Sequence, residues 1–494
     1  MTKFHLKIPI AAMLLGLGLQ GTPSSAASVC DLNSDGSTTV SDVQLCANQA
    51  IHITSCSNGD INQDGNCNVA DVQRVVNAAL GGACASPPPS SARGPQASIT
   101  CPAGAVNINP GTNNIQTAVN ANPAGTTFCL KAGMFSVTSS ISPKSGDTFV
   151  GEYGAILDGT GWTTTVFETG AFQAHNQDIN DVTIRNLIIR KMPQRGIHAY
   201  SSGWCDSTAH ACYFSTAGAD RWTIENNEIA YNAEGINIPT GAIIRNNYIH
   251  HNVGPDPYGP PENRLRGGGF EGLLTQNVLF ENNEISYNGA EMKAGSLTRI
   301  TIFRNNWVHH NLGSGIWYDG ENTGSIIENN IVEDNAAIGI FYEVSGQGII
   351  RNNTVRRNGD NGILISVSQD VDIYGNVVEN NLHGILYLVA CNRVGASEGN
   401  WIGVDYDMKN VSTHDNTVRF DVQSIGKLAS GLTYFSCSDA QIVPYYNGSK
   451  NLTFSHNDYH VPDLAGWYWL WPGTMTWSMW RAIPQDATGS IAVN

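Results

Sequence analysis

Three charged side chains, Lys293, Asp319 and Glu343, occupy equivalent positions in neighbouring segments of the chain, each four residues after a glycine. Side chains of a strand alternate between its two faces, so these charges are expected to point outward while their apolar neighbours point inward. Two carboxyls on adjacent strands would start near the ~5–5.5 Å separation of retaining glycosidases, which use one as nucleophile and the other as acid. Like charges this close resist double ionisation, which favours one protonated carboxyl. Asp319 and Glu343 are the candidate catalytic pair, with Lys293 beside them.

Two outward columns follow from counting residues after each glycine. The position two residues after it reads His198, Asn237, Glu291, Trp317, Phe341 and Leu364. The position four residues after it reads Tyr200, Pro239, Lys293, Asp319, Glu343 and Ser366. Aromatic rings beside carboxylates suit a sugar site. We therefore take Glu291, Trp317, Phe341, His198 and Tyr200 as candidate substrate contacts; the competing interpretation is a salt ladder on a solvated face.

Two long insertions flank these segments, residues 201–219 and residues 254–276. Long loops above one face of a repeat protein commonly form the walls of a binding site. The second insertion carries Arg264 and Arg266, whose guanidinium groups would suit a substrate with carboxylates or sulfates. Both arginines are candidate substrate contacts, although such residues are as often ordinary surface residues.

The elements that position these residues come from a repeat of 20–24 residues between about residue 181 and residue 420. Its core is an apolar residue, two variable residues, Asn-Asn and Ile or Val, followed by Gly-Ile, as in Ile327 to Asn330 before Gly339-Ile340. A period this short fits three short strands per turn. Asparagines tolerate left-handed bends and can stack as hydrogen-bonded ladders.

This repeat resembles the right-handed parallel β-helix superfamily, which includes pectate lyases, polygalacturonases and alginate epimerases. The resemblance covers residues 181–420 and implies a mainly β solenoid that handles a polysaccharide. A helix over residues 115–121 is expected to cap the first coil, since a terminal coil otherwise exposes an apolar face. Five tryptophans crowd into residues 467–480, and we expect them to cover the last coil; a sugar platform is the alternative.

A separate motif repeats at an offset of twenty-nine residues before the solenoid. Each copy is predicted to be a calcium loop followed by one helix, with oxygen ligands at alternating positions and a glycine at the sharp turn. The first loop would use Asp31, Asn33, Asp35, Ser37 and Asp42. The second would use Asp60, Asn62, Asp64, Asn66 and Asp71.

Aspartate at the last loop position and a single helix after each loop resemble the dockerin type I repeat, over roughly residues 29–82. The resemblance implies two Ca²⁺ ions and a cohesin-type protein partner. A calcium-stabilised module without a docking partner is the alternative. The presumed cohesin-contacting pairs are Val40-Ser41 and Val69-Ala70, which differ from the hydroxyl-rich pairs of the best-known dockerins.

The composition and the first residues of the chain predict its location, its domain boundaries and the partners it is unlikely to bind. Residues 1–27 have a basic start, an apolar run and small residues at the end, which predicts a signal peptide and a secreted protein. Residues 28–85 form the calcium-binding module, residues 86–98 a Pro/Ser linker, and residues 99–494 the β-helix. The net charge of −16 disfavours nucleic acid as a partner, and no later apolar run is long enough to span a membrane.

Most of the eleven cysteines are expected in disulfides, because an oxidising compartment is implied. Proximity suggests the pairs Cys101–Cys129, Cys205–Cys212 and Cys391–Cys437. Five cysteines then remain in the calcium-binding module, whose pairing stays open.

Three functions are compatible with these residues. The first is a glycoside hydrolase with Asp319 and Glu343 catalytic. The second is a calcium-assisted polysaccharide lyase, in which Lys293, or Arg264 or Arg266, would abstract a proton beside a uronate carboxylate. Asp319, Glu343 and Glu291 would then hold the calcium. The third is a glycan-binding or surface-attached protein without catalysis.

Overall fold

The structure is a computed structural model that divides into two units, residues 1–90 and residues 91–494. It describes residues 30–35, 37–51, 53–59, 61, 67, 69–79, 93–164, 166, 169–175, 177–200, 204–206, 211–213, 218–254, 267–290, 292–394, 404–421, 427–483 and 485–493. The predicted signal peptide lies outside these residues. So do Glu291, Arg264 and Arg266, and the second-loop ligands Asp60, Asn62, Asp64 and Asn66.

The first unit contains two helices, α1 (Val40–Ala50) and α2 (Val69–Ala79). α1 begins with a capping box, in which the Thr39 hydroxyl accepts from the Ser41 amide and the Asp42 carboxylate accepts from the Thr39 amide at 2.8 Å. Buried Cys30, Cys46 and neighbouring apolar residues form its small core. One helix therefore follows each predicted calcium loop.

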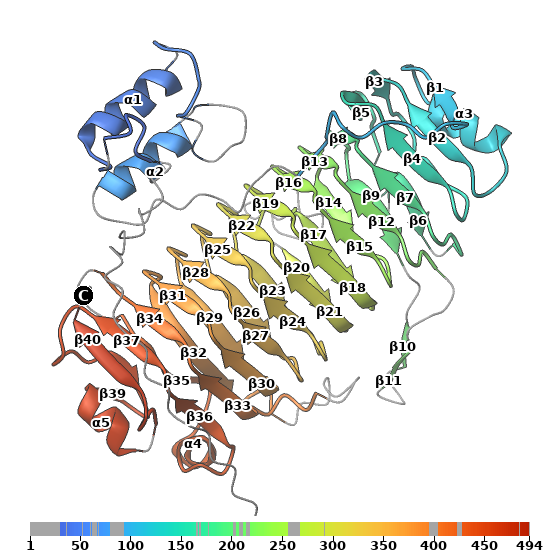
Figure 1. Cartoon of the computed structure of the whole chain (residues 1–494). Coiled ribbons are helices and arrows are strands. Elements are labelled where there is room, and N and C mark those ends of the chain that lie inside the picture. Colours follow the sequence, from blue (N-terminus) through green and yellow to red (C-terminus); the bar gives the residue numbers. More distant parts are fainter. Residues whose placement is uncertain are drawn as a thin grey trace, which may run out of the picture. The chain divides into compact units, whose positions relative to one another are not determined.

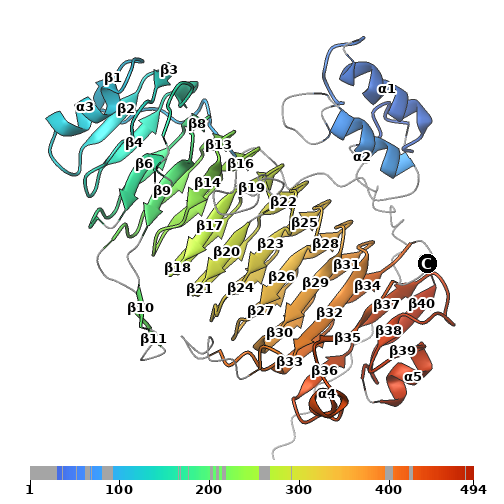
Figure 2. The ribbon, with the colours of Figure 1, turned by 180° about the vertical axis from the view of Figure 1, so that it is seen from behind.

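The second unit is a solenoid of three stacked parallel sheets, here called A, B and C (Figure 1). Most coils contribute one strand to each sheet. Figure 2 shows the same succession from behind, from the cyan end at α3 to the red end at α5. The predicted parallel solenoid is thus confirmed.

Sheet A consists of β1 (Val106–Ile108), β2 (Thr127–Leu130), β4 (Thr148–Gly151), β7 (Thr183–Arg185), β12 (Thr223–Glu225), β15 (Ile243–Arg245), β18 (Gln276–Glu281), β21 (Arg299–Arg304), β24 (Ile326–Glu328), β27 (Ile349–Arg351), β30 (Gln369–Tyr374), β33 (Lys409–His414) and β36 (Leu452–Ser455). Sheet B consists of β3 (Gly133–Ser136), β5 (Ala155–Asp158), β8 (Ile188–Arg190), β13 (Glu228–Ala230), β16 (Tyr248–His250), β19 (Glu284–Ser286), β22 (Trp307–His309), β25 (Ile331–Glu333), β28 (Thr354–Arg356), β31 (Val377–Glu379), β34 (Thr417–Arg419), β37 (Asp458–Val461) and β40 (Ser490–Val493).

Sheet C consists of β6 (Gly170–His175), β9 (Arg195–Tyr200), β14 (Glu234–Asn237), β17 (Phe270–Leu273), β20 (Lys293–Ser296), β23 (Ile316–Tyr318), β26 (Ile340–Glu343), β29 (Asn361–Ser366), β32 (His383–Ala390), β35 (Ser430–Phe435), β38 (Trp469–Leu470) and β39 (Thr474–Met475). An antiparallel pair, β10 (Trp204–Asp206) with β11 (Ala211–Tyr213), projects from the insertion after β9.

Asparagine ladders run along two bends of the solenoid, as the repeat predicts. Between sheets A and B, each buried asparagine donates its side-chain N–H to the carbonyl oxygen of the next one at 2.9–3.1 Å, from Asn227 to Asn457. A second ladder follows sheet B from Asn232 to Asn381 at 2.9–3.1 Å. Each residue of the first ladder follows a residue with positive φ, which in most coils is itself an asparagine, such as Asn329 at 55°. The ladders therefore satisfy buried backbone groups at the bends and fix the stacking of the coils.

Both ends of the solenoid are covered, in agreement with the expectation of caps. At the first coil, α3 (Asn114–Ala121) buries Ile115 and Val119 against the core. At the last coils, Trp469 and Trp480 are fully buried, and Trp471 is nearly so. α4 (Asp439–Tyr446) and α5 (Trp477–Ala482) complete the C-terminal end.

The disulfides agree with the predictions from proximity. Cys101–Cys129 and Cys391–Cys437 are formed. Cys212 is also disulfide-bonded, and Cys205 lies opposite it across the β10–β11 pair. In the first unit Cys56 pairs with Cys67, and Cys46 is a buried free thiol.

The end of the predicted linker lies along the solenoid. The Gly94 amide donates to the Asn246 carbonyl at 2.8 Å. The Arg93 side chain is 6% exposed and pairs with Glu284 at 3.7 Å. Residues 93–96 thus belong to the second unit. Within the described residues, none of the helices is long and apolar enough to cross a membrane.

Candidate functional site

The outer face of sheet C carries the predicted site. In coil order, one outward column reads Gln173, His198, Asn237, Glu271, Lys293, Trp317, Phe341, Leu364 and Leu386. Asp319 directly follows strand β23 and Glu343 ends strand β26, two residues beyond Trp317 and Phe341, and the two strands pair in parallel. The structure therefore brings both carboxyls onto neighbouring coils, about 4.8 Å apart in the stacking direction.

Two expected positions in this column are wrong. Lys293, not Glu291, lies opposite Trp317. In addition, Glu271 lies opposite Lys293, because strand β17 runs through the segment expected to be an insertion loop. The column predicted from glycine spacing therefore lacked one coil and was out of register at the next.

The register error comes from the glycine used for counting. Asn288 stacks on Asn311, so Gly289, one residue after Asn288, is not the equivalent of Gly315, four residues after Asn311. A β-bulge in β20 follows directly after Lys293. Lys293 pairs with Trp317, whereas Gly295 pairs with Tyr318, so β20 has one extra residue at this point. A side chain at Gly295 would place its Cβ 2.4 Å from the Thr298 hydroxyl oxygen, so only glycine fits the bulge. Lys293 lies in the aromatic column just before the bulge, and its ammonium group reaches Asp319.

Each carboxyl of the pair has its own cation. The Lys293 ammonium lies 2.9 Å from Asp319 Oδ2. Arg393 Nη1 lies 3.2 Å from Glu343 Oε1, and the Trp317 indole N–H donates to Glu343 Oε2 at 3.3 Å. Glu343 is the more enclosed of the two, with 16% of its side chain exposed against 24% for Asp319.

The environment raises the pKa of Glu343. Burial contributes most, followed by the negative charge of Asp319. Arg393, the Trp317 hydrogen bond and Lys293 oppose the shift only in part. Glu343 is therefore the carboxyl of the pair that tends to hold a proton, while Asp319 is paired with Lys293.

Trp317 has no open ring face for a sugar. The Lys293 ammonium lies 4.5 Å from the ring centroid on one side, and the Phe341 ring stacks at 5.6 Å with an interplanar angle of 12°. A sugar could meet only the edge of this ring. We therefore assign Trp317 the positioning of Glu343 and Lys293 rather than the sugar stacking expected from sequence.

Other predicted contacts lie farther along the same face. His198 and Asn237 are outward on β9 and β14 and are almost fully buried. The backbone of Tyr200 lies on β9. The positions of Arg264, Arg266 and Glu291 fall outside the described residues.

Sequence reasoning missed four residues at the site. Glu271 lies in the same column, and Arg195 pairs with it at 3.7 Å. Arg393 and Tyr406 come from the segment between β32 and β33, and the Tyr406 hydroxyl donates to Glu321 Oε1 at 2.9 Å. The predicted Cys391–Cys437 pair was a usable signal, since it ties the residues beside Arg393 to the solenoid.

The first loop of the calcium-like motif gathers oxygen-bearing side chains around its own backbone. The Asp35 amide donates to Asp31 Oδ1 at 3.1 Å and to Asn33 Oδ1 at 3.0 Å. The Asn33 amide donates to Asp42 Oδ1 at 3.1 Å, and Asp42 is fully buried. Carboxylate and amide oxygens are the ligands of Ca²⁺, so the donor set fits this ion. Asp42 also caps α1, which gives it a structural role in either case.

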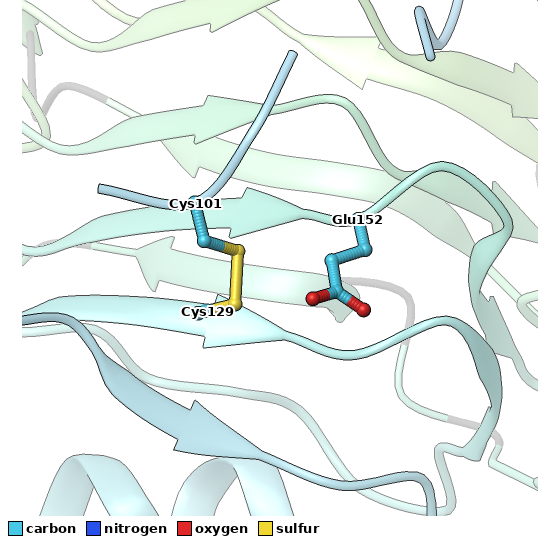
Figure 3. Close-up of side chains that lie close together, drawn as sticks. All are labelled: Cys101, Cys129 and Glu152. Carbon is cyan, nitrogen blue, oxygen red and sulfur yellow. A yellow bond between two sulfur atoms is a disulfide. The ribbon is translucent and has the colours of Figure 1, made fainter. Parts of the chain in front are cut away.

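Cys101, Cys129 and Glu152 form the one close group of potential metal ligands found among the described side chains (Figure 3). The two cysteines are joined in a disulfide, so neither sulfur is a thiolate. The Glu152 carboxylate pairs with Lys131 at 2.7 Å. This group is a cross-link of the first coils, not a metal centre.

Comparison with solved structures gives similar folds at low identity. The A-module of mannuronan C-5 epimerase AlgE6 from Azotobacter vinelandii aligns with a TM-score of 0.52 and 14% identity, over 79% of this chain and 96% of that one. The A-module of AlgE4 from the same organism aligns with a TM-score of 0.46 and 16% identity, over 67% and 92%. None of the curated proteins matches.

The sequence also matches a family model described as a right-handed β-helix region, over residues 169–337 and 298–418. These matches together span residues 169–418, which are 250 of the 494 residues. The matched region contains sheet C from β6 to β32 and therefore the whole carboxyl pair with Lys293, Trp317 and Arg393. The chain belongs to the right-handed β-helix family.

Proposed function

We propose that this chain is a glycan-active enzyme that hydrolyses a polysaccharide, with Asp319 and Glu343 as its catalytic carboxyl pair. The observation that carries the proposal is the unequal environment of two neighbouring carboxyls. Glu343 is enclosed and has a raised pKa, while Asp319 is paired with Lys293 at 2.9 Å. Such a division is what acid and nucleophile require of two groups of the same type.

The roles follow from these environments. Protonated Glu343 donates its proton to the glycosidic oxygen as the leaving sugar departs, and the Asp319 carboxylate attacks the anomeric carbon. Water then releases the glycosyl ester, with Glu343 now accepting the proton. Lys293 holds Asp319, and the Trp317 N–H and Arg393 orient Glu343.

The lyase alternative needs a neutral Lys293 as proton acceptor. In the structure its ammonium is already engaged by Asp319 at 2.9 Å and by the Trp317 ring at 4.5 Å. These contacts support hydrolysis over elimination. The polysaccharide class rests on the resemblance of the repeats and on the similar fold of the AlgE6 A-module, a mannuronan C-5 epimerase.

The test is a panel of acidic and neutral polysaccharides assayed in parallel for new reducing ends and for the ultraviolet absorbance of unsaturated products. Hydrolysis gives reducing ends without absorbance. Absorbance would move the reaction to elimination and make Lys293 the candidate base. Binding without either product would contradict an enzyme and leave the glycan-binding alternative.

We further propose that the first unit binds Ca²⁺ through both repeated loops. Ligands that bind only the folded state stabilise it, by about 2.7 kcal/mol at a concentration of a hundred times Kd. We therefore expect calcium to raise the melting temperature of this unit in the full chain, and a chelator to reverse the rise. Isothermal titration calorimetry should count two ions per chain.

Asp35→Ala removes one oxygen ligand of the first loop and should reduce that count to one. Ser41→Ala is the matched control, because Ser41 is exposed on α1 and is not a predicted ligand. Equal titrations of wild type and Asp35→Ala would contradict the assignment of the first loop. Docking to a cohesin-type protein and secretion through residues 1–27 stay predictions from the sequence.

A further inference from the structure

A buried carboxyl lies directly behind the proposed catalytic pair. Glu321 follows Asp319 by two residues and is only 1% exposed. Its amide donates to the carbonyl of Val344 at 2.6 Å, and Val344 is the residue after Glu343. One backbone hydrogen bond therefore joins the turns that carry the two catalytic carboxyls.

Tyr406 reaches this turn from a distant part of the sequence. Its hydroxyl donates to Glu321 Oε1 at 2.9 Å. Its ring packs against Val344, Val367 and Ala390, which belong to three successive coils. Burial and the charge of Glu321 raise the pKa of Tyr406, so its hydroxyl stays a donor. Tyr406 thus contacts both the buried carboxyl and the apolar cluster that contains Val344, the residue after Glu343.

The segment that carries Tyr406 is fixed at both ends to the C-terminal region. At one end the disulfide Cys391–Cys437 holds the residues next to Arg393. At the other, the Tyr445 hydroxyl donates to Asp407 Oδ1 at 2.7 Å, and Lys450 pairs with the same carboxylate. These anchors limit how far Tyr406 can move from Glu321.

We propose that Tyr406 is a positioning residue, which acts through buried Glu321 to fix the spacing of Asp319 and Glu343. This inference rests on the proposed function for its effect on turnover, but the spacing itself has a readout without substrate. Asp319 raises the pKa of Glu343 because the two carboxyls are close. If the turn behind Asp319 loosens, that contribution falls and the pKa of Glu343 moves down towards its ordinary value.

The variant is Tyr406→Phe, which keeps the ring against Val344, Val367 and Ala390 and removes only the donor to Glu321. The titration of Glu343 is followed by carboxyl ¹³C NMR on glutamate-labelled protein, with the signal assigned by its loss in Glu343→Gln. We expect the midpoint to fall by at least ~0.5 pH unit. On a cleaved glycan, kcat should fall about tenfold with KM unchanged.

Two control variants separate positioning from other effects. Tyr374→Phe removes a hydroxyl that accepts from Arg351 at 2.9 Å on sheet A and should leave the Glu343 midpoint unchanged. Glu321→Gln keeps an oxygen that can accept from Tyr406, so its effect should be smaller than that of Tyr406→Phe. An unchanged midpoint and kcat in Tyr406→Phe would overturn the proposal, as would a complete loss of turnover equal to that of Glu343→Gln.

The two proposals can fail separately. If no glycan is cleaved by the wild type, the proposed hydrolase fails, yet the titration of Glu343 still decides whether Tyr406 positions the pair. A lower melting temperature of Tyr406→Phe with an unchanged midpoint would show a merely structural role and overturn the inference.

Discussion

Replacing Glu343 with glutamine is expected to lower the rate of glycan hydrolysis about a thousandfold, because a positioned general acid contributes ~10²–10⁴-fold. Glutamine keeps the size of the side chain and an oxygen that can accept from the Trp317 indole, which donates to Glu343 at 3.3 Å. It has no proton to donate to the leaving sugar. The loss should therefore appear in kcat, with little change in KM.

The pH dependence gives the same prediction a second readout. Catalysis needs Glu343 protonated, so the rate should fall as the pH rises through the pKa of this carboxyl. Burial and the charge of Asp319 raise that pKa above the ordinary value of 4.5. The basic limb of the kcat profile should accordingly lie above this value, and a limb at or below it would contradict the assignment of Glu343 as the acid.

Glu328→Gln is the matched control. Glu328 is 15% exposed and pairs with Arg351 at 2.6 Å on sheet A, whereas Glu343 is 16% exposed and pairs with Arg393. The two substitutions each remove a carboxyl that pairs with an arginine, at similar exposure but on different faces. Equal losses of activity would mean that the solenoid is damaged and not that an acid is missing. Asp319→Asn should be as damaging as Glu343→Gln, because it removes the proposed nucleophile.

Periodicity made the fold and part of the site predictable. The repeat with its paired asparagines required a tight bend at each coil, and a bend that recurs in register stacks its amides into a ladder. The glycine spacing placed Trp317 beside Phe341 correctly, because β23 and β26 both follow the repeat without interruption. In coils without interruptions, the register of strand pairing can therefore be predicted from the sequence.

Interruptions of the repeat could not be predicted from residue spacing in the same way. The coil of β20 is shorter between Asn288 and Lys293 than the next coil is between Asn311 and Trp317, and a bulge then adds one residue after Lys293; no spacing rule predicts either change. Strand β17 lies inside a long insertion, so the sequence predicts a loop where Glu271 joins sheet C. Arg393 and Tyr406 belong to a segment without repeats, and their approach to Glu343 and Glu321 depends on tertiary contacts that only coordinates reveal.

Replacing Asn330 with alanine is expected to cost about 3–5 kcal/mol of the free energy of unfolding, since several buried partners lose their hydrogen bonds. The Asn330 amide group donates to the Phe303 carbonyl at 2.8 Å and to Asn353 Oδ1 at 2.9 Å. Its oxygen accepts from the Asn306 amide at 2.9 Å and from the Asn306 side chain at 3.1 Å. The side chain is 1% exposed, so water cannot take over these contacts.

The neighbouring Asn329→Ala is the control for this substitution. Asn329 is exposed and has a φ of 55°, so alanine there costs only the ~1–2 kcal/mol of a left-handed residue with a Cβ. Denaturant unfolding of both variants measures the difference, and hydrogen exchange locates it. Each coil contacts only its neighbours, so the loss of amide protection should centre on the coils of Asn306, Asn330 and Asn353. If Asn330→Ala lowered the free energy of unfolding no more than Asn329→Ala, the asparagine ladder would be a result of coil stacking and would not itself stabilise the stack.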